Sequence, residues 1–90
     1  MRRCRLSGTT VESLPQLYRE LSRQLGLPNH FGNNLDALWD VLTTDVAGPV
    51  EVIWEDAEAS RRALGADFAR VAALFEAVAD ARDDFRIVFR

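Results

Sequence analysis

Two aspartates and a tryptophan recur at helical spacing in residues 34–44 of this 90-residue chain. In a helix, a rotation of about 100° per residue would bring Asp36 and Asp40 onto one side, with Trp39 beside them. Paired carboxylates can act as general acid and general base, as they do in hydrolases. They can also present negative charge to a basic partner. On spacing alone, a solvated helix face is the commonest outcome.

The neighbours of these two acids favour binding over catalysis. Acids four residues apart destabilise an isolated helix by roughly 0.2–0.5 kcal/mol, which points to a role outside the helix. Trp is the residue type most enriched at interface hot spots. Aromatic area and hydrogen-bonding groups are added nearby by His30, Phe31, Asn34 and Thr43. A helix surface on so short a chain also offers no evident deep cleft, where paired carboxylates act.

The remaining residue types predict no other chemistry. His30 is the only histidine and Cys4 the only cysteine, so neither a disulfide nor a metal site with cysteine and histidine spacing is expected. No serine lies in a recognisable nucleophile motif. Cys4 is interpreted as a small buried side chain. We therefore expect no cofactor, no metal and no enzymatic activity.

Composition narrows the class of partner. Acidic residues outnumber arginines by 14 to 11 and lysine is absent, giving a net charge of −3, which argues against binding along a nucleic-acid backbone. Arg2, Arg3 and Arg5 are interpreted as a solvated edge strand. Neither a secretory apolar segment nor a membrane span is seen, so a cytoplasmic location is expected.

The elements that would position the acids are predicted from periodicity. Strands are expected at residues 3–7, 50–54 and 85–89, with Trp54 in the core. A helix capped by Ser13 and ended by Gly26, a short helix capped by Asp56, and a longer apolar-striped helix after Gly65 complete the chain. This order predicts one α/β domain over residues 1–90, with a three-stranded parallel sheet and about four helices.

The acidic helix itself has a predicted start and a predicted buried face. Residues 29–33 are expected to form an exposed loop, and Asn33 or Asn34 to cap the helix. Leu35, Leu38 and Leu42 fall on one stripe that should face the core. After this helix the Gly48-Pro49 pair predicts a turn, where a cis peptide is compatible with the sequence but not specified by it.

The run Leu27-Pro28, followed by Phe31-Gly32-Asn33-Asn34-Leu35-Asp36-Ala37-Leu38-Trp39-Asp40, resembles the signature of the barstar family of bacterial ribonuclease inhibitors. The similarity extends over the whole chain, including the Leu-rich first helix, Pro49 before the apolar strand, and Trp54 with Glu55. The resemblance implies a barstar-like fold and an intracellular inhibitor. Such an inhibitor would plug the active site of a small secreted, guanyl-specific ribonuclease in a one-to-one complex and would be monomeric when free.

The resemblance also implies roles for single residues. Asp40 would enter the enzyme's phosphate site, and Asp36 would pair with basic groups at its rim. Packing and hydrogen bonds would come from Gly32, Asn34, Leu35, Trp39 and Thr43, with His30 and Phe31 at positions that are often aromatic. Thr44 and Asp45 are included as partner-binding residues at the C-terminal border of the surface. They stand where the family can have a glycine followed by an aromatic residue, so the interface is expected to differ from the family pattern at this border. The family's contacting glutamate aligns near Ala77, and Glu76, which lies one residue away, is included as a partner-binding residue.

Two other classes stay open from the sequence. The chain could bind a different basic nuclease toxin, which inhibition assays against unrelated nucleases would reveal. It could instead be a small hydrolase that uses Asp36 and Asp40, in which case the purified protein would turn over substrate by itself.

Overall fold

The computed structural model describes residues 1–28 and 32–90. Along this part of the chain lie β1 (Arg2–Ser7), α1 (Leu14–Leu25), α2 (Leu35–Thr44), β2 (Val50–Glu55), α3 (Ala57–Leu64), α4 (Ala66–Ala81) and β3 (Phe85–Phe89). The three strands pair in parallel in the order β1-β2-β3. The predicted α/β fold with a three-stranded parallel sheet is therefore confirmed.

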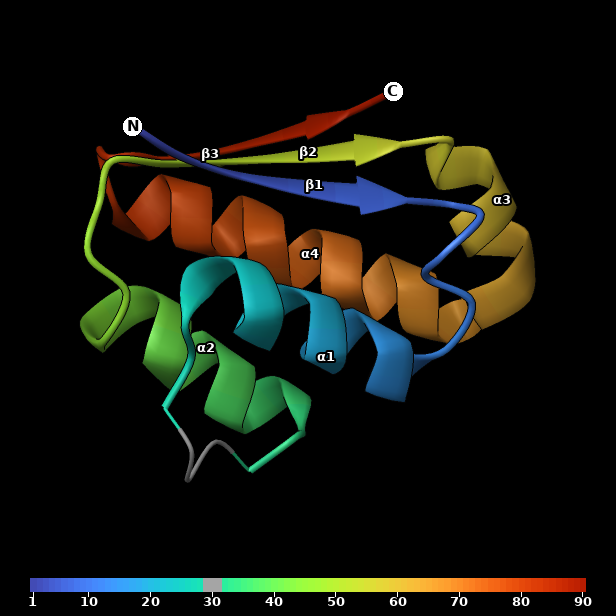
Figure 1. Ribbon diagram of the computed structural model, residues 1–90, viewed down its shortest axis with the longest axis horizontal. Helices are drawn as coiled ribbons and strands as arrows, with labels where there is room; N and C mark the ends of the chain where they lie inside the picture. The colour runs from blue at the N-terminus through green and yellow to red at the C-terminus, as the bar shows by residue number, and fades with distance from the viewer. Residues whose placement is uncertain (29–31) are drawn as a thin grey trace.

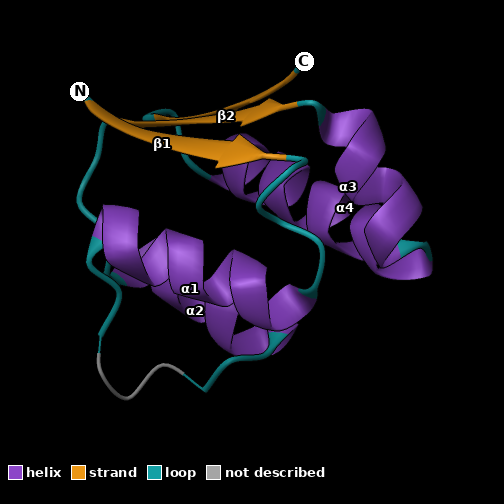
Figure 2. Ribbon diagram, turned by 45° about the vertical axis from the view of Figure 1, so that its right-hand side comes forward, coloured by secondary structure: helices purple, strands orange, loops and turns teal. Residues whose placement is uncertain are grey.

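The helices all lie on one side of the sheet, as Figures 1 and 2 show. In Figure 1, α2 is the element farthest from the strands, and it packs on α4. The opposite face of the sheet is open and charged. Arg3 and Arg86 flank Glu51 at one register position, with Nε to carboxylate distances of 3.3 and 3.9 Å. The predicted solvated arginine strand is confirmed, beginning at Arg2 rather than at Arg3.

Local capping explains where α1 begins and ends. The Ser13 hydroxyl accepts a hydrogen bond from the Gln16 amide at 3.3 Å, which satisfies one of the free N–H groups of the first turn. Gly26 ends the helix with a φ of 66°, a left-handed conformation that glycine adopts without steric cost. Both ends were predicted from the sequence, and both are confirmed.

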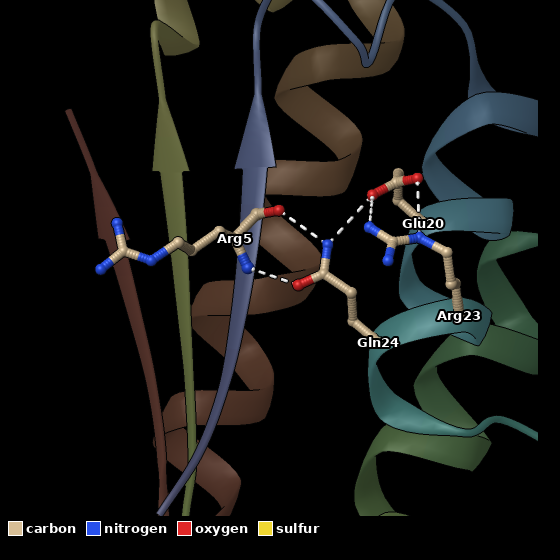
Figure 3. Close-up of polar contacts among 4 residues, drawn as sticks. All are labelled: Arg5, Glu20, Arg23 and Gln24. Atoms are coloured by element: carbon tan, nitrogen blue, oxygen red, sulfur yellow. Dashed lines mark hydrogen bonds and ion pairs between the residues drawn. The ribbon is translucent and has the colours of Figure 1, made fainter.

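A side-chain amide ties α1 to the free edge of β1 (Figure 3). The Gln24 carbonyl accepts from the Arg5 backbone N–H at 2.8 Å, while its amide nitrogen donates to the Arg5 carbonyl at 2.8 Å. Glu20 accepts from the same nitrogen at 3.0 Å and from Arg23 at 2.7 Å. Gln24 thus occupies backbone groups through which an edge strand could pair with another chain.

The core is built around Trp54, which is fully buried as predicted. Its ring packs edge-on against Phe68 and Phe75, with centroids 5.2 and 6.1 Å away. Its indole N–H donates to the Ser60 hydroxyl at 2.9 Å, so the polar atom is satisfied. Cys4 is buried as predicted, and burial raises the pKa of its thiol to about 12.

Three local predictions need correction or completion. Asp56 precedes α3, but it adopts a left-handed φ of 51° and its side chain forms no capping hydrogen bond. On α2 the buried stripe is rotated, because Val41 joins Leu38 and Leu42 in the core while Leu35 is only half-buried. The Gly48-Pro49 peptide is cis. Across residues 1–28 and 32–90, no helix has the length and apolarity needed to cross a membrane.

Candidate protein-binding surface on α2

The position of α2 is set by one cap and one apolar face. The Asn34 side chain accepts a hydrogen bond from the Ala37 amide at 2.8 Å, which identifies Asn34 as the predicted cap. Leu38 and Leu42 are completely buried, and Val41 is 6% exposed. This anchoring leaves the other side of the helix facing solvent, on the part of the molecule most distant from the sheet (Figure 1).

The exposed side of α2 carries most of the predicted binding residues. We call it the α2 surface, and its exposed members are Gly32, Asn34, Asp36, Trp39, Asp40, Thr44 and Asp45, with Leu35 and Thr43 half-buried. Trp39 is 36% exposed, and among residues 1–28 and 32–90 it is the only exposed aromatic side chain. The structure therefore brings the predicted acids and the indole together on one helix, with aromatic area beside negative charge.

The two central carboxylates of the α2 surface have no cationic partner among residues 1–28 and 32–90. Neither Asp36 nor Asp40 forms an ion pair or a side-chain hydrogen bond there. By contrast, arginines in the same part of the chain pair with six other acids, namely Glu20, Glu51, Glu55, Glu58, Asp67 and Asp84. Residues 24–60 contain no arginine or lysine. The local field at α2 is therefore more negative than the net charge of −3 suggests.

The threonines at the end of α2 are engaged within the helix. The Thr43 hydroxyl donates to the carbonyl of Trp39 at 2.7 Å, and the Thr44 hydroxyl donates to the carbonyl of Asp40. Such back-bonding satisfies the hydroxyl hydrogens but leaves oxygen lone pairs and methyl groups for a partner. Each threonine would therefore act as an acceptor or through packing.

The surroundings of Asp36 are open. Asp36 borders an open groove that is formed by the N-terminal parts of α1, α2 and α4 and that includes the Asp67 and Arg70 ion pair at 2.8 Å. Asp40 is not among the residues that line this groove. Of the two carboxylates, therefore, only that of Asp36 lies along this groove. Within residues 1–28 and 32–90, no group of three His, Cys, Asp or Glu side chains is arranged to hold a metal ion.

The other predicted contact residues fall into two cases. His30 and Phe31 lie outside the residues that the structure describes. Glu76 is exposed, but it lines a pocket formed by α3, α4 and β3, to which α2 contributes no residue. A contact between Glu76 and a partner bound on α2 stays a prediction. Sequence reasoning missed Arg82, whose guanidinium reaches the end of α2 from a position 40 residues away.

Fold and surface together define a small α/β protein that presents an acidic, tryptophan-bearing helix suited to a basic protein surface. The family described as "Barstar (barnase inhibitor)" matches residues 1–90, and the chain belongs to this family. A Bacillus subtilis (strain 168) protein named "Putative ribonuclease inhibitor YrdF" is 34% identical over 89 residues, which cover 98% of each chain. The family resemblance of the sequence is thereby confirmed.

Proposed function

We propose that this protein inhibits a small secreted bacterial ribonuclease of the guanyl-specific type by inserting the α2 surface into its active site. The observation that carries the proposal is a pair of carboxylates, Asp36 and Asp40, that have no ionic partner among residues 1–28 and 32–90 and lie beside an exposed indole, in a chain of the barstar family. The relative from B. subtilis is itself named as a ribonuclease inhibitor. The inhibitor would act inside the producing cell, as a monomer that forms a one-to-one complex.

Asp40 is proposed to take the place of a substrate phosphate. A ribonuclease must hold a phosphodiester with cationic side chains, and a carboxylate held at that point can accept charge-assisted, bidentate hydrogen bonds from arginine. Asp40 lies mid-helix, where the buried Leu38, Val41 and Leu42 fix the backbone that carries it. The backbone that carries the Asp40 carboxylate is therefore already ordered before binding. Little further conformational entropy is lost when the complex forms, which favours tight binding.

Asp36 is proposed to act at the rim of the enzyme's site. It lies one helical turn before Asp40, so the two carboxylates can meet separate cations. The negative field of α2 would also speed encounter with a basic enzyme, and the rate would fall with added salt. Trp39, Asn34, Thr43, Thr44 and Asp45 would surround these charges with packing area and hydrogen-bonding groups.

The test is a titration of a guanyl-specific ribonuclease with wild type, Asp36→Ala and Asp40→Ala. Wild type should abolish activity at one molar equivalent. Asp40→Ala should weaken binding by several kcal/mol, because the enzyme's cations would be left buried and unpaired. That magnitude is carried over from the barnase and barstar pair, the reference system for such effects. Asp36→Ala should weaken binding less, since rim charges are better solvated.

Glu55→Ala is the matched control. It removes one carboxylate at the end of β2, where Glu55 pairs with the exposed Arg5 at 3.1 Å, and exposed pairs contribute little to stability. Inhibition by Glu55→Ala should equal that by wild type. Equal inhibition by all four proteins would refute the assignment of the α2 surface. Inhibition only of an unrelated basic nuclease would identify a different toxin as the partner, and turnover by the protein alone, abolished by Asp40→Asn, would indicate a hydrolase.

A further inference from the structure

The C-terminal end of α2 lacks a cation of its own. The last turn contains no basic residue, and the residue that follows it is Asp45. A helix C-terminus carries a partial negative charge and leaves its final carbonyls without intrahelical donors. Asp40 and Asp45 add further negative charge to this end. A cationic side chain from outside the helix would both satisfy these carbonyls and offset the negative charge.

Arg82, which follows α4, supplies that group. Its Nη1 donates to the Leu42 carbonyl at 2.6 Å and to the Val46 carbonyl at 2.9 Å. One nitrogen thus joins the last turn of α2 to the start of the loop that leads to β2. In Figure 1 the C-terminal ends of α2 and α4 lie on the same side of the molecule, which is what allows this contact.

The guanidinium of Arg82 is itself held in place. Its Nε and Nη2 donate to the two carboxylate oxygens of Asp84 at 2.8 and 2.9 Å, a bidentate arrangement. These bonds raise the pKa of Arg82 and lower the pKa of the Asp84 carboxyl. The Arg82 side chain is only 13% exposed. The Arg82 guanidinium and the Asp84 carboxylate are both charged at neutral pH. Their two parallel hydrogen bonds therefore hold the guanidinium in one orientation.

The loop is also packed tightly against this pair. A Cβ added to Gly48 would lie 2.1 Å from Asp84 Oδ2 and 2.7 Å from Arg82 Nη2, so no larger side chain fits without displacement. Arg82, Asp84, Gly48 and the two carbonyls therefore form a connected unit. We call this unit the Arg82 cap. It connects the end of the α2 surface to α4 and to the start of β3.

We infer that Arg82 is a positioning residue for ribonuclease binding, which fixes the last turn of α2 through the Leu42 and Val46 carbonyls. This inference rests on the proposed function. A partner that meets Asp40, Thr43 and Asp45 needs them at fixed positions, and a loose last turn would have to be ordered on binding. Lysine cannot replace Arg82 fully. The planar guanidinium donates to two backbone carbonyls and to a carboxylate at once, and a single ammonium group cannot reproduce that geometry.

Binding measurements test this inference at a temperature where every variant is fully folded. Arg82→Met should weaken binding of a guanyl-specific ribonuclease by about tenfold, equivalent to about 1.4 kcal/mol. Arg82→Lys should give a smaller loss. Arg62→Met is the matched control, since it removes an arginine that is 76% exposed on α3, and it should bind like wild type. Arg82→Met that binds like wild type would overturn the inference.

A positioning role also predicts where the loss is coupled. In double mutants, the change in binding free energy caused by Arg82→Met should not add to that caused by Thr43→Ala, because Thr43 lies at the end of α2 that the Arg82 cap holds. It should add to the change caused by Asp36→Ala, because Asp36 lies two turns away and the effects of distant, independent sites are additive. A general loss of stability would not distinguish the two ends. Equal coupling to both positions would therefore refute positioning by the cap.

Hydrogen exchange in the free protein separates this inference from the proposed function. The Asp45 and Val46 amides donate to the Val41 carbonyl at 2.9 and 3.1 Å, and both should exchange faster in Arg82→Met. The Leu38 amide, in the first turn of α2, should be unchanged. If wild type binds no ribonuclease, the proposed function fails, and the exchange rates still test the cap. Unchanged Asp45 and Val46 rates would show that Arg82 does not fix the end of α2. If Arg82→Met does not fold, Asp84→Asn provides the same test, because it removes the charged carboxylate that holds the Arg82 guanidinium in place.

Discussion

Ser60 provides the sharpest test of how the core is held together. It is the only buried polar residue within 1–28 and 32–90, with no exposed surface. Its hydroxyl accepts from the Trp54 indole N–H at 2.9 Å and donates to the Val11 carbonyl at 2.9 Å. One hydroxyl thus joins α3, β2 and the segment between β1 and α1. Ser60→Ala would leave a buried donor and a buried acceptor without partners.

The expected cost follows from those two groups. A buried polar group that loses its partner costs about 1–3 kcal/mol, while alanine recovers about 0.5 kcal/mol of helix propensity in α3. Since two groups lose their partners, Ser60→Ala should lower the free energy of unfolding by about 1.5–5.5 kcal/mol. In a protein of this size that corresponds to a fall in Tm of roughly 8–30 °C. The loss would be a large fraction of the total stability.

Urea denaturation followed by tryptophan fluorescence measures this change. Ser22→Ala is the matched control, because Ser22 is half-buried on α1 and its hydroxyl bonds to no residue that the structure describes. The control should lie within about 0.5 kcal/mol of wild type. A Ser60→Ala protein as stable as the control would show that Trp54 and Val11 do not depend on this hydroxyl.

Three further predictions concern stability. Gly8→Ala should destabilise the fold by at least about 2 kcal/mol in urea denaturation, because the new Cβ would lie 2.0 Å from the Asp56 carbonyl oxygen; a change below 0.5 kcal/mol would contradict this packing. Asn34→Ala should cost about 1 kcal/mol by loss of the α2 cap, Asn34→Asp should cost less, and equal losses would exclude the cap as the cause. Burial raises the pKa of the Cys4 thiol from 9.0 to about 12, so the thiol ionises first in the unfolded chain. Stability that is complete below about pH 9 should therefore fall as the pH rises toward 12, by up to about 1.4 kcal/mol per pH unit. The fall should be smaller in Cys4→Ala, and identical slopes would contradict burial of the thiol.

The fold was largely predictable because its determinants are local. Ser13 and Gly26 specify the ends of α1 through backbone conformations that only a few residue types favour. The β-branched and aromatic run beginning at Val50 specifies a buried strand. The alternation of strands and helices then leaves few topologies. The prediction that the Asp56 side chain caps α3 was wrong. Aspartate is common at helix caps, but it is also one of the few residue types that adopt the left-handed conformation seen here.

The α2 surface was only partly predictable, because its details depend on contacts that are distant in sequence. Residue spacing identified the acidic side, yet the packing of α2 on α4 decides that Val41 is buried while Leu35 is half-exposed. Arg82 reaches the Leu42 carbonyl across 40 residues, and no periodic signal marks that contact. Within residues 1–28 and 32–90, no arginine pairs with Asp36 or Asp40, and this becomes apparent only when the arginines have been placed in the fold.

Competition with a small active-site ligand tests most directly whether the α2 surface occupies the phosphate site of a ribonuclease. The Kd of the complex would be measured by calorimetry at increasing concentrations of guanosine 3′-monophosphate. Mutually exclusive binding predicts that the apparent Kd rises in proportion to nucleotide concentration, and that Asp40→Ala binds weakly even without nucleotide. A Kd that stays constant while the enzyme is saturated with nucleotide would contradict the account, because the inhibitor would then bind elsewhere.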